Sequence, residues 1–191
     1  TMHSGDCFLV PGPVRMSEAC LQAMATPVMT ARGPEFRQVM AGLNSGLRYA
    51  FNLSPSKPEM KTQSWTGEDG YRVVVVSGSG TAAMEMVIAN RFRSNDLVLV
   101  PTNGKFGERV ADICRQFCNV KHLNYEWGRS FDLYELEQQL ERGCYEALLI
   151  CHNETSTGIT QDAEAIAEMC ERHGVSFILD GITSVGGMPV H

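Results

Sequence analysis

The sequence lacks the features of several large classes of protein. Its Lys and Arg residues form no cluster, and the net charge is −6. A surface that binds nucleic acid needs a basic face, so we expect no nucleic-acid partner. No apolar run approaches the ~18 residues of a membrane-spanning helix, and the start, TMHSGDCFLV, lacks the basic segment and apolar core of a signal peptide. We therefore expect a cytoplasmic protein without a membrane partner.

Paired cysteines are also lacking. The seven cysteines are an odd number, and no two of them form a CxxC pair. This pattern indicates neither a disulfide framework nor a zinc knuckle. We expect reduced thiols and no structural metal.

What the sequence does contain is the composition of a globular domain, 43% hydrophobic and 20% charged over 191 residues. From Arg72 onward, short apolar runs alternate with helical patterns. The predicted strands are residues 73–76, 97–100, 120–125, 147–151 and 177–179, and the predicted helices include 81–92, 107–117 and 162–173, with another that follows Asp132. This alternation favours an α/β fold with a mostly parallel sheet and helices on both faces, in three layers.

Two helices are predicted before this region. Ser17 is a suitable N-cap for a short helix that ends near Met24. A stronger helix begins at Pro34, and its apolar residues share one face, which we expect to lie in the core. They are Phe36, Val39, Met40, Leu43 and Leu47.

The run Val175–Leu179 ends abruptly at one carboxylate, Asp180. A short, continuous apolar run is typical of a strand buried on both faces. In open α/β sheets the carboxyl ends of the strands are where ligands bind, so Asp180 should either meet a partner or bind one. The alternative is that Asp180 only caps the turn that follows.

The segment SGSGTAAME, residues 77–85, follows an apolar run and opens a helix. Gly78 and Gly80 allow a tight turn, and Ser79 and Thr81 add hydroxyl groups at a helix N-terminus, where an anion such as phosphate is favoured. The segment also matches the GxGxxA dinucleotide pattern, but the next strand ends in Pro-Thr-Asn without the required acid. A third alternative is a turn needed only for packing.

Two further polar segments follow predicted strands. In NGKFGER, residues 103–109, Phe106 stands between glycines, where its ring could cover a flat ligand or simply pack in the core. In CHNETSTG, residues 151–158, a strand runs into a polar loop that could also be ordinary solvated surface. His152, Glu154 and Asp180 could be imagined as metal ligands, but no helical or hairpin spacing pairs them.

These four segments together resemble one known family. SGSGTAAME, PTNGKFGER, HNETSTG and LDGITSVGGMP are similar to motifs of the class V aminotransferases, which are pyridoxal-phosphate (PLP) enzymes of fold type I. The resemblance extends from VPGP at Val10–Pro13, through ARGPEFRQV at Ala31–Val39, to the last residues. It implies an enzyme that transfers an amino group between a small amino acid, of the alanine, serine or aminoethylphosphonate type, and a 2-oxo acid such as pyruvate or glyoxylate.

The resemblance also implies roles for individual residues. Ser79, Gly80 and Thr81 would bind the cofactor phosphate, Phe106 would stack on the pyridine ring, and Thr155 would bond near the ring hydroxyl.

Two more roles follow from the resemblance. Asp180 would pair with the pyridine nitrogen and keep it protonated, which makes it the catalytic residue of this chain. Gly12, within Pro11–Pro13, would lie near the substrate carboxylate.

The family's Schiff-base lysine is not in this chain. In relatives it lies some twenty to thirty residues after the Asp, whereas this sequence ends at His191; its lysines are Lys57, Lys61, Lys105 and Lys121. We therefore expect residues 1–33 to be an N-terminal arm with a short helix, and 34–191 to be the N-terminal portion of the large PLP-binding domain. A homodimer or a complementing C-terminal half is the expected partner. The alternatives are a non-catalytic PLP-binding or assembly half, which works only with a complementing chain, and, third, a dinucleotide-binding domain.

Overall fold

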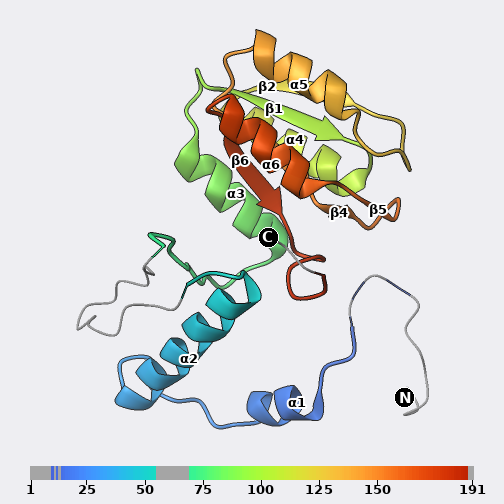
Figure 1. The fold of residues 1–191 in the computed structure, drawn as a ribbon. Coiled ribbons are helices and arrows are strands. Elements are labelled where there is room, and N and C mark those ends of the chain that lie inside the picture. The colour runs from blue at the N-terminus through green and yellow to red at the C-terminus, as the bar shows by residue number, and fades with distance from the viewer. Residues whose placement is uncertain (1–9, 11, 13, 55–68, 189–191) are drawn as a thin grey trace. The chain divides into compact units, whose positions relative to one another are not determined.

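The computed structural model describes residues 10, 12, 14–54 and 69–188. The chain divides into two compact units, residues 1–74 and 75–191 (Figure 1). The boundary expected between residues 33 and 34 stays a prediction. None of the helices in the described part of the chain combines the length and apolar character needed to cross a membrane.

The first unit contains the two predicted helices, α1 (Glu18–Met24) and α2 (Pro34–Ala50). The side chain of Ser17 accepts a hydrogen bond from the backbone N–H of Cys20, which confirms the predicted N-cap. The expectation that the apolar face of α2 lies in the core is wrong. Val39 is 52% exposed and Leu43 40% exposed, because an apolar stripe shows that a helix needs cover but not that the described chain supplies it.

The second unit is built on a parallel sheet of four strands, β1 (Leu97–Thr102), β2 (Asn119–Asn124), β3 (Ala147–Cys151) and β6 (Ser176–Asp180). The strands lie in the order β2-β1-β3-β6, and each neighbouring pair is parallel. The predicted parallel sheet is confirmed, with all strand boundaries within two residues of those expected.

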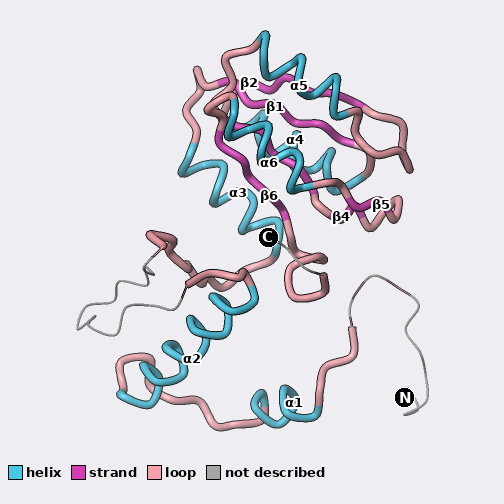
Figure 2. The backbone as a smooth tube through the Cα atoms, viewed as in Figure 1, coloured by secondary structure: helices cyan, strands magenta, loops and turns pink. Residues whose placement is uncertain are grey.

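Two helices cover each face of this sheet, which confirms the three-layer α/β fold (Figure 2). On one face, α3 (Gly80–Arg91) and α4 (Lys105–Phe117) enclose an apolar cluster that includes Val98, Val100 and Leu149. On the other face, α5 (Leu133–Arg142) and α6 (Ala163–Arg172) enclose a cluster that includes Leu99, Leu148 and Ile150. Successive residues of β1 and β3 therefore serve opposite faces, as the pleat of a strand requires.

Two of the predicted strands differ from expectation. Residues 73–76 join neither sheet, and Val74 is 71% exposed. Strand β6 forms as predicted, but it is an edge strand and all five of its residues are partly exposed, whereas those of β3 are fully buried. An apolar run indicates a need for burial, while pairing and burial depend on which neighbour the tertiary structure provides.

A small hairpin follows β3. Strands β4 (Asn153–Glu154) and β5 (Ile159–Thr160) pair antiparallel, so the polar segment 151–158 is an ordered turn and not an open loop.

Candidate active site at the carboxyl edge of the sheet

Three of the four candidate segments meet at one edge of the sheet. Because β1, β3 and β6 are parallel, the segments that follow them, residues 103–109, 151–158 and 180–187, leave from the same edge. The fourth, at the start of α3, approaches the turn after β6. A Cβ atom added to Gly80 would lie 2.6 Å from Cδ1 of Ile182, so a larger residue at position 80 would displace the exposed side chain of Ile182.

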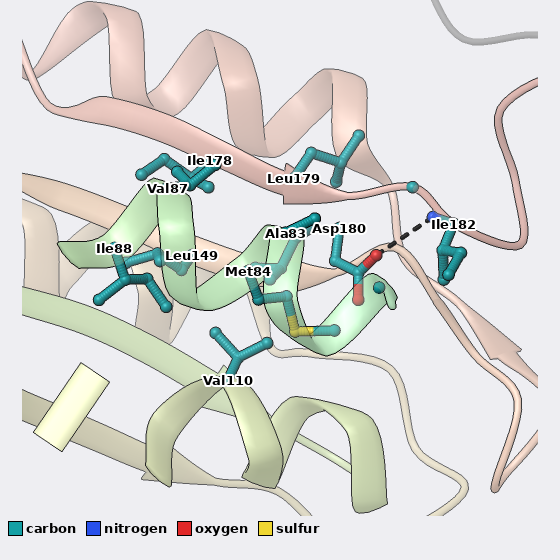
Figure 3. Close-up of a pocket in the computed structure, with 13 residues that line it drawn as sticks. Ala83, Met84, Val87, Ile88, Val110, Leu149, Ile178, Leu179, Asp180 and Ile182 are labelled. Atoms are coloured by element: carbon teal, nitrogen blue, oxygen red, sulfur yellow. Dashed lines mark hydrogen bonds between the residues drawn. The ribbon is translucent and has the colours of Figure 1, made fainter. Parts of the chain in front are cut away.

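Asp180 ends β6 with its two carboxylate oxygens in different environments. Oδ1 accepts a hydrogen bond from the backbone N–H of Ile182 at 3.1 Å, so the turn-capping alternative holds for this oxygen (Figure 3). Oδ2 is buried and has no hydrogen-bond partner among the described residues. Burial, with a smaller contribution from the charge of Glu154, raises the pKa of Asp180, and the bond from Ile182 opposes this shift.

A hollow of about 230 Å³ lies between α3 and β6, and Asp180 stands at one end of it (Figure 3). The other lining side chains are apolar, and they include Met84, Val87, Ile178 and Leu179. A single carboxylate in an apolar wall, with one oxygen unsatisfied, can accept a hydrogen bond from a cationic donor on an organic ligand.

Two hydroxyl groups at the start of α3 already accept hydrogen bonds within the chain. Oγ of Ser79 accepts a hydrogen bond from the backbone N–H of Ala82 at 3.2 Å and so caps the helix. Oγ1 of Thr81 accepts one from Nη1 of Arg109 at 3.4 Å. The backbone N–H groups of the first turn carry the positive end of the helix dipole.

Phe106 lies in the first turn of α4 and is half-buried. The guanidinium carbon of Arg109 lies 5.3 Å from the centre of its ring, a cation–π contact. Arg109 thus touches both Phe106 and Thr81 and links the two helix starts. The sequence interpretation did not single out Arg109; the available signal was its spacing of three residues from Phe106, which places both on one helix face.

Glu154 is the most deeply buried charged residue of the edge, with no exposed surface. Its Oε2 accepts hydrogen bonds from the backbone N–H groups of Phe106 at 3.0 Å and Gly107 at 2.9 Å. Its Oε1 accepts from the backbone N–H and the hydroxyl of Ser156, at 3.1 Å and 2.5 Å. The sequence interpretation considered Glu154 only as a metal ligand, and this role as a cap for a distant helix was missed.

The remaining candidates occupy varied positions. His152 is buried with Nδ1 2.8 Å from Oγ of Ser184, and burial lowers its pKa. Thr155 is half-buried in the hairpin turn, and Gly12 is exposed in the first unit. Within the described residues, no three His, Cys, Asp or Glu side chains are gathered as a metal site would require.

A family model and individual relatives were compared with this sequence. The family described as Aminotransferase class-V matches residues 50–191. The soluble hydrogenase 42 kDa subunit of Anabaena cylindrica is 32% identical over 96% of this chain and 45% of its own length. The (S)-ureidoglycine–glyoxylate transaminase of Bacillus subtilis is 29% identical over 96% of this chain and 41% of its own length.

Solved structures agree. The crystal structure of an alanine–glyoxylate aminotransferase from Nostoc sp. superposes with a TM-score of 0.81 at 32% identity, and it covers all of this chain and 48% of its own. The chain spans about half the length of the curated relatives it matches. With the family match over most of its length and the same fold in a solved relative, the chain belongs to the class V aminotransferases, a family of pyridoxal-phosphate-dependent enzymes.

Proposed function

We propose that the protein containing this chain is an aminotransferase that moves an amino group between a small amino acid and a 2-oxo acid such as glyoxylate or pyruvate. The names of its relatives support the acceptor class, because two of them, the transaminase from Bacillus subtilis and the aminotransferase from Nostoc sp., act with glyoxylate. The amino donor would be of the alanine, serine or aminoethylphosphonate type.

The unsatisfied Oδ2 atom of Asp180 is the observation that carries this proposal. A buried acceptor without a partner costs about 1–3 kcal/mol, so its presence at the end of a hollow calls for a donor from a ligand. A protonated pyridine nitrogen is such a donor, and its charge would pair with the ionised carboxylate. The residues present therefore fit pyridoxal phosphate.

The rest of the edge suits the other parts of the same cofactor. Ser79, Gly80 and Thr81 would hold the phosphate at the N-terminus of α3, where backbone N–H groups and the helix dipole favour an anion. Phe106 would cover one face of the ring. Thr155 would bond near the ring hydroxyl.

When bound, the cofactor supplies an electron sink for the substrate carbanion. This chain's part is to keep the ring nitrogen protonated through Asp180, to hold the phosphate, and to cover the ring. Gly12 would contribute to the place for the substrate carboxylate. The lysine required by the family's chemistry would come from another part of the protein that contains this chain.

The dinucleotide alternative lacks the residue it needs. At the end of β1, where an acid would bind the ribose, stands Asn103, which is buried and donates from Nδ2 to the backbone oxygen of Arg129 at 2.6 Å.

Kinetics of the full-length protein would test the proposal. We expect transamination with glyoxylate or pyruvate, and we expect Asp180→Asn to reduce kcat far more than it reduces cofactor affinity, because the missing charge matters most when the ring accepts electrons. Asp112→Asn, which removes a carboxylate whose side chain is 71% exposed on α4, is the matched control. Equal loss of turnover and affinity in Asp180→Asn would contradict the assigned role.

We also propose that a further polypeptide covers the β6 edge, either the complementing C-terminal half or a second copy in a homodimer. Within residues 14–54 and 69–188, strand β6 has a partner on one side only, and its five residues are partly exposed. Unpaired strand edges beside apolar surface promote association. Size-exclusion chromatography with light scattering should show an assembly or aggregate of the 191-residue chain; a stable, soluble monomer would count against this proposal.

A further inference from the structure

We propose that Glu154 is a positioning residue of the cofactor site, which fixes the first turn of α4 and through it the ring of Phe106. This inference rests on the proposed function, since it concerns where Phe106 stands relative to a bound cofactor. It assigns a role to a residue that touches neither the hollow beside Asp180 nor the start of α3.

Helix α4 has no cap of its own. Its N-cap residue is Gly104, which has no side chain to accept hydrogen bonds, so the first N–H groups of the helix need acceptors from elsewhere. Ser156 accepts from Lys105 at 2.9 Å, and Oε2 of Glu154 accepts from Phe106 and Gly107. The hairpin of β4 and β5 thus caps a helix that begins some fifty positions earlier in the chain.

The carboxylate suits this position in charge as well as in geometry. A negative group at a helix N-terminus is stabilised by the dipole, and charge-assisted hydrogen bonds are about twice as strong as neutral ones. All four hydrogen bonds to the carboxylate of Glu154 are 3.1 Å or shorter, and the side chain has no contact with solvent. The cost of burying the charge is therefore met by donors on both oxygens.

The backbone of Glu154 is fixed as firmly as its side chain. Glu154 pairs with Ile159 in the hairpin, and its carbonyl oxygen accepts from the N–H groups of Thr157 at 3.1 Å and Gly158 at 2.8 Å. A Cβ atom added to Gly104 would lie 2.5 Å from Cδ of Glu154 and 2.7 Å from Oγ of Ser156. Glycine at position 104 lets the helix start reach the carboxylate.

The carboxylate of Glu154 binds the backbone of the residue that carries the ring. The N–H bound by Oε2 belongs to Phe106 itself, so any shift of that hydrogen bond moves the Cα of the ring-bearing residue. Sites that bind a flat ring depend on supporting groups that hold the stacking residue to within about 0.5 Å. The neighbouring Arg109, one turn on, would move with it.

The test uses full-length protein in which the cofactor has been removed and is then titrated back. The affinity for pyridoxal phosphate and the visible circular dichroism of the bound cofactor are measured for Glu154→Gln. The amide group can accept on one oxygen only, and its NH2 would face backbone donors. We expect the affinity to fall about tenfold and the dichroic band to change. The control, Glu108→Gln, removes a half-buried charge that pairs with Lys105 in the same helix turn, and it should do neither.

A double-mutant cycle separates positioning from general damage. If Glu154 acts through the ring, the loss caused by Glu154→Gln should largely disappear in a Phe106→Leu background. Full additivity of the two losses, or an unchanged affinity and spectrum in Glu154→Gln, would overturn the inference while the proposed function stands. If the unchanged protein binds no pyridoxal phosphate, the proposed function fails first, and the cofactor role of Glu154 fails with it.

A second variant guards against misfolding. Ser156→Ala removes the acceptor for Lys105 and one donor to Glu154 but leaves the carboxylate in place. We expect a smaller loss of affinity in the same direction, together with faster hydrogen exchange at the amides of Phe106 and Gly107. Unchanged exchange at both amides in both variants would overturn the proposal.

Discussion

Asp180 lies opposite Cys151 at the carboxyl ends of β6 and β3, so a carboxylate and a thiol stand side by side at the edge that holds the candidate site. The last backbone hydrogen bond between these strands also lies here, where the N–H of His152 donates to the backbone oxygen of Asp180 at 3.0 Å. Burial raises the pKa of both side chains, and the charges of Asp180 and Glu154 help to raise that of Cys151 to about 12. Cys151 is therefore a neutral, unreactive neighbour, and the negative charge of this edge belongs to the carboxylates.

Asp180→Asn should stabilise the cofactor-free protein near neutral pH by about 1 kcal/mol, because the variant no longer buries an unsatisfied charge. The folded-state pKa of Asp180 is raised, so the folded protein binds this proton more tightly than the unfolded chain does. The stability of the unchanged protein should fall as pH rises through that raised pKa. Urea unfolding at about pH 4 and about pH 7 should show the gain only at the higher pH. An equal gain at both values would contradict the explanation.

Two substitutions of Ser79 test its role as the N-cap of α3 separately from its proposed role in binding the phosphate. Ser79→Ala should lower the free energy of unfolding by about 1 kcal/mol, because the N–H of Ala82 loses its acceptor. Ser79→Asp should keep the cap and the stability but repel the phosphate, so cofactor affinity should fall in a protein whose thermal midpoint is unchanged. Unimpaired binding of pyridoxal phosphate by Ser79→Asp would exclude this turn as the phosphate site.

The contacts that Glu137 of α5 makes with Arg172 and His173 at the end of α6 should stop stabilising the protein in acid. Glu137 accepts from Nη2 of Arg172 at 2.7 Å, and its other oxygen lies 2.7 Å from Nε2 of His173. The bond with His173, and then Arg172, lowers the pKa of Glu137, so its contribution to stability is present above the ordinary glutamate pKa and is lost as pH falls through the lowered value.

Glu137→Gln should accordingly destabilise the protein at neutral pH, with the difference vanishing in acid. Glu126→Gln is the control, because its ion pair with Arg129 is largely exposed on both sides. A destabilisation that persists unchanged at low pH would show that packing, and not charge, holds the two helices.

Thiol labelling should divide the six described cysteines into two groups. Cys20 and Cys144 are exposed and should react rapidly with a thiol reagent in the native protein. The buried group should react only after denaturation, since burial raises the pKa of Cys114 to about 12 and of Cys170 to about 11. It comprises Cys114, Cys118, Cys151 and Cys170. Mass spectrometry of labelled peptides would check the assignment, and rapid native labelling of Cys151 would show that the edge beside Asp180 opens.

Much of the second unit was predictable from the sequence. Period, capping residues and apolar runs are local properties, and they predicted the four strands that form the parallel sheet and the helices between them, although they also predicted a fifth strand at 73–76 that does not form. Chain order and the parallel sheet then predicted that the segments holding Phe106, Thr155 and Asp180 would share one edge.

Only the tertiary structure decided how that edge is held together. Glu154 caps the helix that holds Gly107, 47 positions earlier, and Arg109 joins Phe106 to Thr81. One oxygen of Asp180 has no donor in the described part of the chain, and no local pattern encodes these relationships. The sequence also does not determine which apolar segments are buried. The apolar stripe on α2, the run 73–76 and strand β6 are each partly or largely exposed. Apolar sequence determines what must leave water, whereas which surface provides the shelter depends on residues that meet only when the chain is folded and assembled.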